Sequence, residues 1–539
     1  MKPAFTLSQE IGRIPFLRLT VPLIAGIVVA DRLDIAVGVL LGSAVALLVG
    51  GALFRDERVR AVLLVALLVY VGILSVKVRV PAENIPRGQR LLVRGVVTDH
   101  VSSPVAGRWQ RSTARLEVFR EWGDIASVWQ PTRENILIYI DTAYRLVLGE
   151  QFAAVGYVNS LDSTGSSGYA RTMHARGITG RFYMTTGGLV ESSPADHLTL
   201  WQKTKFLSKR IQKSLCNRLA TLDMDHREEG VAMALIAGYT HELEAPVRDA
   251  YSRSGTSHVL AVSGLHLGIL FLILQVALTP LLALRRGYLW RSWAIALCLW
   301  GYAFITGLSP SVLRSAFMLS MLQFSLMTVW RYNSYNALFS SAFVLLLINP
   351  YYLYDISFQM SYLAVFSILF FYPRFNRWFG ARSLERKLTL CEEHSRGIMR
   401  AGWWCLRSLF SMSATALLIG LAAQIAVAPL VGYTFGRIPL LALLINPVVV
   451  PLVTVIMTVA LAYLMLGGIP LLGGWIGEVT AVLFRWQNKL VYWTASSPGA
   501  SVEQVAFSGT MLLVVYALLI FVLLFIKWQE QTAAKPTAQ

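Results

Sequence analysis

Hydrophobic and polar positions divide the chain into three stretches with different patterns. Three apolar runs come first, at residues 16–30, 35–54 and 61–76, and a membrane span needs about 20 residues of this kind. Residues 81–195 lose this pattern. From residue 230 the apolar runs return, and eight further spans are predicted at 259–284, 293–306, 312–329, 337–348, 356–371, 409–431, 440–466 and 510–526.

The middle stretch alternates between apolar and polar residues, with the period of a half-buried β-strand. The alternation is clearest at 91–99, 114–120, 135–141 and 151–158, with Gly and Pro between these segments. Some five short strands in a stretch of this length are typical of a small β-barrel. The strand pattern alone does not separate an OB-fold from other small barrels.

Two further helices are predicted near the membrane surface. Residues 198–222 are basic and amphipathic, which is typical of a helix along that surface. Residues 475–493 carry Glu478, Arg485 and Lys489 among three Trp residues, which favours an interfacial helix and leaves open whether it crosses. The predicted domains are 1–80 with about three spans, 81–195 with the barrel, 196–229 with the basic helix, 230–530 as the main membrane domain, and 531–539 as a polar tail.

Composition and charge place the chain among polytopic membrane proteins. Hydrophobic residues make up 55% and charged residues 14% of the sequence. The formal net charge of +18 fits Lys and Arg gathered in cytoplasmic loops, and it also suits a polyanion partner. The distribution of Lys and Arg among the loops predicts a cytoplasmic N-terminus and a barrel outside the cytoplasm. The four Cys residues have no metal-type spacing, and no metal or cofactor is predicted.

A polar motif at residues 254–268 stands directly before an apolar run. It reads Ser-Gly-Thr-Ser-His-Val-Leu-Ala-Val-Ser-Gly-Leu-His-Leu-Gly. Polar groups at membrane depth are costly unless they face protein or water, so this segment is expected to contribute to a site or a path.

The same motif, extended upstream to residue 248, resembles the signature segment of the ComEC competence family of inner-membrane DNA-uptake channels. Other blocks resemble the family in its order: 169–180 upstream, and then 307–318, 349–350, 355–364, 424–429, 433, 435–436, 446–447 and 451. The resemblance therefore reaches from about residue 80 to residue 455. It implies a polytopic α-helical membrane protein with a small extracytoplasmic OB-like β-barrel domain, in the cell inner (cytoplasmic) membrane.

The resemblance also implies a function and partners. It implies a channel that carries single-stranded DNA into the cytoplasm during natural transformation, with lipid around it. A periplasmic or surface DNA receptor, and a cytoplasmic DNA-translocating ATPase or single-strand-binding proteins, are the expected partners. Many members carry a metallo-β-lactamase-like domain, but no His-x-His-x-Asp-His set and no phosphate-binding loop occur in this sequence. We therefore expect no enzyme activity here, and degradation of the other strand falls to a separate nuclease if it occurs.

Candidate residues fall into two groups. The predicted DNA path contains His258, Ser263, Gly264, His266, Arg314, Asp355, Gln359, Gln424 and Asn446. The predicted DNA-receiving residues are Arg94, Trp109, Arg111, Trp122, Lys203, Lys209 and Arg210, because aromatic stacking and phosphate contacts hold single strands. For each of these residues, the alternative is an ordinary structural role in packing or on the protein surface.

Three structural expectations accompany these candidates. Arg314 is expected to line the path or to pair with Asp355, because an intramembrane Arg needs a partner or water. Pro429, Pro447 and Pro451 are expected to break two helices beside a polar conduit. Ser263 as the nucleophile of an intramembrane hydrolase is disfavoured, because no base with an orienting acid is apparent.

A secondary transporter or lipid-handling permease is the main alternative function, although it would not need a nucleic-acid-type barrel.

Overall fold

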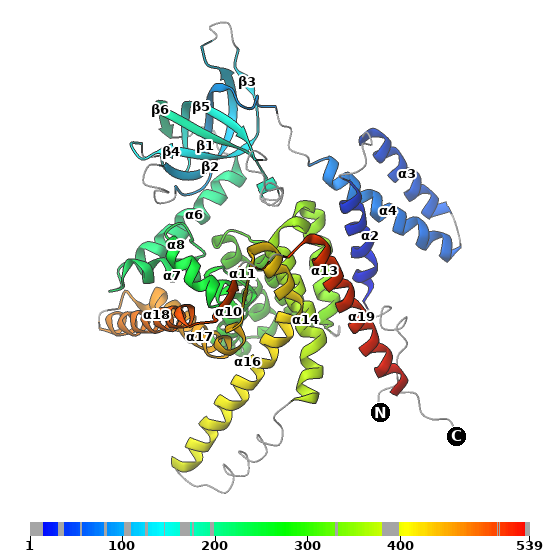
Figure 1. Cartoon of the computed structure of the whole chain (residues 1–539), viewed down its shortest axis with the longest axis vertical. Helices are drawn as coiled ribbons and strands as arrows, with labels where there is room; N and C mark the ends of the chain where they lie inside the picture. The colour runs from blue at the N-terminus through cyan, green and yellow to red at the C-terminus, as the bar shows by residue number, and fades with distance from the viewer. Residues whose placement is uncertain are drawn as a thin grey trace.

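The computed structural model describes residues 14–30, 37–53, 56–79, 84–101, 109–123, 128–144, 146–161, 173–174, 177–194, 199–328, 332–379, 398–469, 471–503, 505 and 507–533. A β-barrel stands on a body of helices, and three N-terminal helices lie to one side of that body (Figure 1). The predicted class, a polytopic α-helical membrane protein with a small OB-like barrel, is confirmed.

The barrel closes around five strands, β1 (Arg90–Val97), β2 (Trp109–Glu121), β4 (Asn135–Asp141), β5 (Glu150–Ser160) and β6 (Ile178–Pro194), with a two-residue β3 (Gln130–Pro131) at its edge. β1 pairs with both β2 and β5, which closes the sheet, and β4 pairs with β6 in parallel while the other pairs are antiparallel. This strand order is that of an OB-fold. Four strands fall where the alternation predicts them; β6 follows the last predicted strand and was not predicted.

Three helices form at the first three apolar runs, α2 (Pro15–Ala30), α3 (Val37–Leu53) and α4 (Glu57–Lys77). α2 and α4 approach closely at Gly26, where a Cβ would lie 2.1 Å from the carbonyl oxygen of Val69. Small residues allow such contacts between membrane helices. α2 also contacts α13 (Ser334–Ile348), where the Thr20 hydroxyl donates to the carbonyl of Phe339 at 3.0 Å, and this attaches the N-terminal helices to the body.

The main helices of the body are α10 (Gly264–Ala277), α11 (Gly287–Ile305), α12 (Pro310–Met327), α13, α14 (Ile356–Trp378), α16 (Ile398–Phe435), α17 (Ala442–Leu466), α18 (Leu472–Ser496) and α19 (Gly509–Ala533). Among the described residues, five helical stretches are long and apolar enough to cross a membrane: Glu57–Lys77, Ile356–Trp378, Ser413–Phe435, Ala442–Leu466 and Gly509–Glu530. Four shorter helices are also apolar, α10 and α13 among them. The chain is a membrane protein.

The predicted continuous span at 259–284 is wrong. This run holds the end of the short α9 (Ser257–Leu260), a non-helical link at 261–263, α10, and the 3-10 helix η2 (Thr279–Ala283). Ser263 has extended backbone angles and is the N-cap of α10. Hydropathy could not locate this break, because apolar side chains continue on both sides of it.

The predicted breaks at Pro429, Pro447 and Pro451 are also wrong. α16 continues through Pro429, and α17 continues through Pro447 and Pro451. A proline removes one backbone hydrogen bond, and neighbouring groups in a packed membrane domain can satisfy the carbonyl that it leaves free.

Three helices form a layer between the barrel and the body: α6 (Leu200–Leu219), α7 (His226–Ala237) and α8 (Ala245–Arg253). α6 is hydrogen-bonded both to the body and to another helix of the layer. Its Ser208 hydroxyl donates to Phe304 of α11 at 3.1 Å, and its Gln212 side chain donates to Ala237 of α7 at 2.8 Å. α17 and α18 pack as an antiparallel hairpin against α7 and α8, and their apolar side chains share one core with this layer.

Candidate functional site

A cavity of about 3340 Å³ reaches from the barrel into the membrane domain. At the barrel end its lining includes Arg111 and Asn135, which lie on the neighbouring strands β2 and β4. Its lining continues past α6 and the loop after α7 to the starts of α10, α12 and α14, and along α16 as far as Arg407. One continuous cavity therefore joins the barrel face to the membrane helices.

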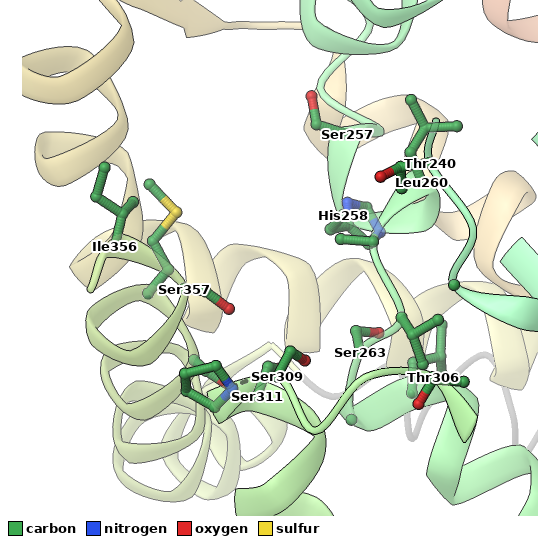
Figure 2. A pocket seen from close by; sticks show the side chains of 18 of the residues that line it. Thr240, Ser257, His258, Leu260, Ser263, Thr306, Ser309, Ser311, Ile356 and Ser357 are labelled. Carbon is green, nitrogen blue, oxygen red and sulfur yellow. Dashed lines mark hydrogen bonds between the residues drawn. The ribbon is translucent and has the colours of Figure 1, made fainter. Parts of the chain in front are cut away.

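The middle of the cavity is polar because three helices begin there. The first residues of α10, α12 and α14 all line it, together with the hydroxyls of Ser263, Ser309, Ser311 and Ser357. Figure 2 shows these serines around the same space, with His258 on the far side from Ser357. The start of an α-helix leaves backbone N–H groups without partners inside the helix, so side chains or bound groups must satisfy them.

Ser263 and His266 form a capping box at the start of α10. The backbone N–H of Ser263 donates to Nδ1 of His266 at 3.1 Å, and the Ser263 hydroxyl lies 3.0 Å from the same nitrogen. His266 is fully buried, and its Nε2 has no hydrogen-bond partner. A hydrolytic dyad would need a group that orients this nitrogen, so the pair acts as a helix cap. His266 does not line the cavity, whereas His258 does.

Arg314 of α12 lies at the cavity wall and does not pair with Asp355, contrary to the expected ion pair. Its Nε donates to the hydroxyl of Ser361 at 2.9 Å and its Nη2 to that of Ser315 at 3.2 Å. Asp355 instead caps α14, because its carboxylate accepts from the backbone N–H groups of Ser357 and Phe358 at 2.8 and 3.2 Å. A carboxylate stabilises a helix start in this way.

Gly264 permits the close approach of Arg314. A Cβ at Gly264 would lie 2.6 Å from the hydroxyl oxygen of Ser315 and 2.8 Å from Nη2 of Arg314. Gln424 and Asn446 also line the cavity, and Oδ1 of Asn446 is buried without a partner. Gln359 is not among the lining residues, and its side chain donates to the carbonyl of Leu353 at 2.8 Å.

The structure separates the predicted DNA-receiving residues. Arg111 and Lys209 line the cavity, whereas the others are not among its lining residues. Lys209 is also paired with Asp99 of the barrel at 3.0 Å. Lys203 and Arg210 are exposed on α6, and Trp109 stands at the start of β2.

Arg94 and Trp122 belong to a separate surface of the barrel. The Arg94 guanidinium lies 5.6 Å from the ring centre of Trp129, and that of Arg90 lies 5.8 Å from the ring centre of Trp122. Arg94 also pairs with Glu191 at 3.7 Å. These contacts join β1 to the end of β2, to the residue before β3 and to β6, and none of these residues lines the cavity.

Sequence reasoning missed the junction between the barrel and α6. The His100 Nε2–H donates to the carbonyl of Lys209 at 3.1 Å, and the His100 ring packs against those of Tyr239 and His241 with centroids 5.4 and 6.5 Å apart. His241 Nε2 lies 3.8 Å from the Asp99 carboxylate. These residues are far apart in the sequence and belong to no motif.

The junction also sets the protonation of its members. Burial lowers the pKa of His100 and that of His241, and Asp99 opposes both shifts without cancelling them. Burial of Asp99 disfavours its charge, but Lys209, together with His241 once that ring is protonated in acid, outweighs this effect, so the pKa of Asp99 is below its ordinary value. The imidazoles are therefore neutral at pH 7 and the carboxylate is charged.

The charge along the cavity is net positive. Among the residues described, seven Lys or Arg side chains line it against four Asp or Glu side chains. The basic residues occur at both ends and in the middle, with Arg111 at the barrel, Arg314 at the helix starts and Arg407 on α16. No group of three His, Cys, Asp or Glu that could hold a metal ion occurs among the described residues.

The fold and this cavity define a polytopic membrane protein in which an OB-like barrel opens onto a cavity among membrane helices, and polar side chains gather in the middle of that cavity. The family model described as "Competence protein" matches residues 235–529, which is more than half of the chain. The chain belongs to this family, as the ComEC resemblance indicated.

Two relatives match parts of the chain. ComE operon protein 3 of Bacillus subtilis is 37% identical over 142 residues, which cover 26% of this chain and 18% of that protein. An uncharacterized protein of Aquifex aeolicus is 25% identical over 285 residues, which cover 53% of this chain and 57% of that protein. The chain thus spans less than two thirds of either relative. No solved structure matches.

Proposed function

We propose that this protein is a channel that carries single-stranded DNA across the cell inner membrane into the cytoplasm during natural transformation. The observation that carries the proposal is the cavity that joins the β2–β4 face of an OB-like barrel to the membrane domain of a Competence-family chain. OB-folds commonly bind oligonucleotides on the corresponding strands.

The strand would enter along the barrel, with Arg111 at the start of the path. It would then pass His258, Ser263, Gly264, Arg314, Asp355, Gln424 and Asn446, which all line the cavity. The wall between the charged residues is rich in serine and threonine hydroxyls. Such a wall suits transport, because conduction requires weak binding at several sites rather than tight binding at one.

Orientation and partners complete the proposal. The distribution of Lys and Arg among the loops favours a barrel outside the cytoplasm, and DNA would then arrive from a periplasmic or surface receptor. On the cytoplasmic side, a DNA-translocating ATPase or single-strand-binding proteins would draw the strand in. A separate nuclease would remove the other strand. In this scheme the chain itself carries out no chemical reaction.

The test follows labelled DNA and scores transformants in a competent host from which the gene is deleted. The channel predicts DNA that enters the envelope but not the cytoplasm, with transformants lost. Arg111→Ala should lower transformation several-fold, whereas Arg210→Ala removes the same charge from an exposed position outside the cavity and should have little effect. Undiminished transformation after deletion, without a second copy in the host, would favour the transporter or permease.

A further inference from the structure

Arg314 is a buried cation without a paired anion. It is 6% exposed, and no Asp or Glu among the described residues forms an ion pair with it. Arg374 on α14 is buried to a similar extent, at 7% exposed, but it pairs with Glu530 at 2.7 Å. A charge at membrane depth needs a paired anion or a polar space, so the occupant of the cavity that Arg314 lines determines how this charge is stabilised.

The protein positions this guanidinium firmly but does not neutralise it. Its hydrogen bonds go to the hydroxyls of Ser361 and Ser315, and Nη1 lies 3.8 Å from the sulfur of Met318. Ser361 is itself 2.9 Å from the hydroxyl of Ser311. Because an Arg side chain has five N–H donors, some remain for a ligand in the cavity that Arg314 lines.

The surroundings favour an anion at the same place. α12 begins one turn before Arg314, and its N-cap Ser309 makes no side-chain hydrogen bond to the first turn. α14, in contrast, has its own carboxylate cap in Asp355. The start of α12 therefore adds its partial positive charge to that of Arg314 and leaves its N–H groups available.

We propose that Arg314 and the start of α12 form a phosphodiester-binding station inside the cavity. This inference rests on the proposed function, because it states where along the path the phosphodiester group of each passing nucleotide would bind. Arg suits this role, since its planar group can bind two phosphate oxygens at once. A lipid headgroup carries the same chemistry, so the experiment must separate the two sources.

The first measurement uses Ala364→Cys in the full-length chain, in vesicles of zwitterionic lipid. Ala364 lines the cavity one turn beyond Ser361. A negatively charged thiosulfonate reagent should modify this cysteine roughly fivefold faster than a positively charged reagent of similar size, because one nearby fixed charge attracts the first and repels the second. The chain without the new cysteine gives the background. Equal rates would overturn the proposal.

The second measurement varies the charge. Arg314→Gln in the Ala364→Cys chain should abolish the preference for the negative reagent, whereas Arg314→Lys should retain it. A preference that survives Arg314→Gln would assign the effect to other residues and overturn the role of Arg314. If the Gln variant does not reach the membrane, the two reagent rates with native Arg314 still decide whether the station attracts anions.

The third measurement identifies the ligand and separates the two proposals. An oligothymidylate should slow the modification, and an uncharged-backbone oligomer of the same sequence should not. Protection by phosphatidylglycerol in the vesicles but not by the oligothymidylate would overturn the assignment to a strand. If the negative reagent reacts faster but deletion of the gene leaves transformation unaffected, only the proposed channel is contradicted. If deletion abolishes transformation but the two reagents react at equal rates, only the station is contradicted.

Discussion

At the scale of single residues, the close approach at Gly264 gives a sharp prediction. Gly264→Ala places a methyl group against Ser315 and Arg314, so the guanidinium must move. Overpacking of this kind costs about 1–3 kcal/mol, and the shift should also lower transformation. Gly268→Ala is the matched control on the same helix, because a Cβ there meets nothing within 4 Å. Thermal unfolding of the purified chain and transformant counts should change for the first variant only.

The residue types predicted the polar site around Arg314 but not its contacts. Small and polar residues at 254–268 and 307–315 indicated a polar place in the membrane, and Arg314 was conspicuous because charge is expensive there. Its partners were not predictable. Asp355 seemed the natural counter-charge, but whether it faces Arg314 or its own helix start depends on backbone geometry that the residue types do not fix.

At the scale of elements, hydropathy and alternation predicted most helices and strands but not their breaks. The run at 259–284 is predominantly apolar, yet its backbone is interrupted at 261–263. The prolines of α16 and α17 gave the opposite error, because packing against other helices tolerates a missing hydrogen bond. The pattern did not predict β6, because residues 178–194 do not alternate regularly between apolar and polar side chains.

α18 is the element whose placement the sequence left open, and it forms a hairpin with α17, which the sequence predicts as a span. β7 (Arg437–Pro439) precedes α17 and pairs with β8 (Ser501–Glu503), which follows α18, so the hairpin starts and ends at one place. Arg437 there pairs with Asp249 of α8. At the other end of α17, the carbonyl of Leu464 accepts from Arg218 of α6 at 2.8 Å. Both ends of the hairpin therefore touch the layer of α6 and α8.

The outer side of α18 fits the same placement. Trp475, Trp486 and Trp493 are eleven and seven residues apart, which is close to whole helical turns, so they share one face. They are 67%, 70% and 69% exposed. The opposite face buries Gln487 and Asn488 against Tyr251 of α8. An exposed Trp stripe opposite a packed polar face is typical of a helix in the membrane interface.

We therefore predict that α17 and α18 lie along the membrane surface and do not cross, although α17 is apolar enough to do so. Cysteines at Leu440, Gly468, Gly474 and Ser496 should all react with an impermeant maleimide from the same side of sealed vesicles. Arg58→Cys and Lys77→Cys, at the two ends of α4, should react from opposite sides. If Gly468 and Gly474 react from the side opposite to Leu440 and Ser496, both helices cross.

At the scale of the whole molecule, the barrel is joined to the membrane domain through the contacts of Asp99, His100 and His241 with α6 and with each other. These contacts place Arg111 over the cavity. They connect positions more than a hundred residues apart, and for this reason neither the motifs nor the hydropathy pattern indicated them. The sequence indicated that a barrel and a membrane domain exist, whereas their relative placement depends on polar contacts that carry no periodic pattern.

The same junction predicts that acid weakens the attachment of the barrel. The pKa values of His100 and His241 are lowered when the barrel is docked, so the undocked form binds more protons once the pH falls below the ordinary histidine value of about 6.5. The two neutral histidines contribute fully to the stability of docking above that pH. This contribution is lost as the pH falls through their pKa values in the docked form. Asp99 also destabilises the docked form in stronger acid. Its pKa is lowered in the docked form, and protonation of its carboxylate removes the pair with Lys209.

Energy transfer between dyes on Val128→Cys of the barrel and Leu471→Cys of the membrane domain measures this attachment, since both positions are exposed. The transfer efficiency should change reversibly between pH 7.5 and 5.5. His241→Phe cannot gain a charge and can still pack against Tyr239, so it should reduce the pH response while the efficiency at pH 7.5 stays the same. A response that is equal in both chains would assign the acid sensitivity to groups outside the junction. If acid loosens this attachment, the junction no longer holds Arg111 over the cavity, and transformation should fall with the same pH profile as the dye signal.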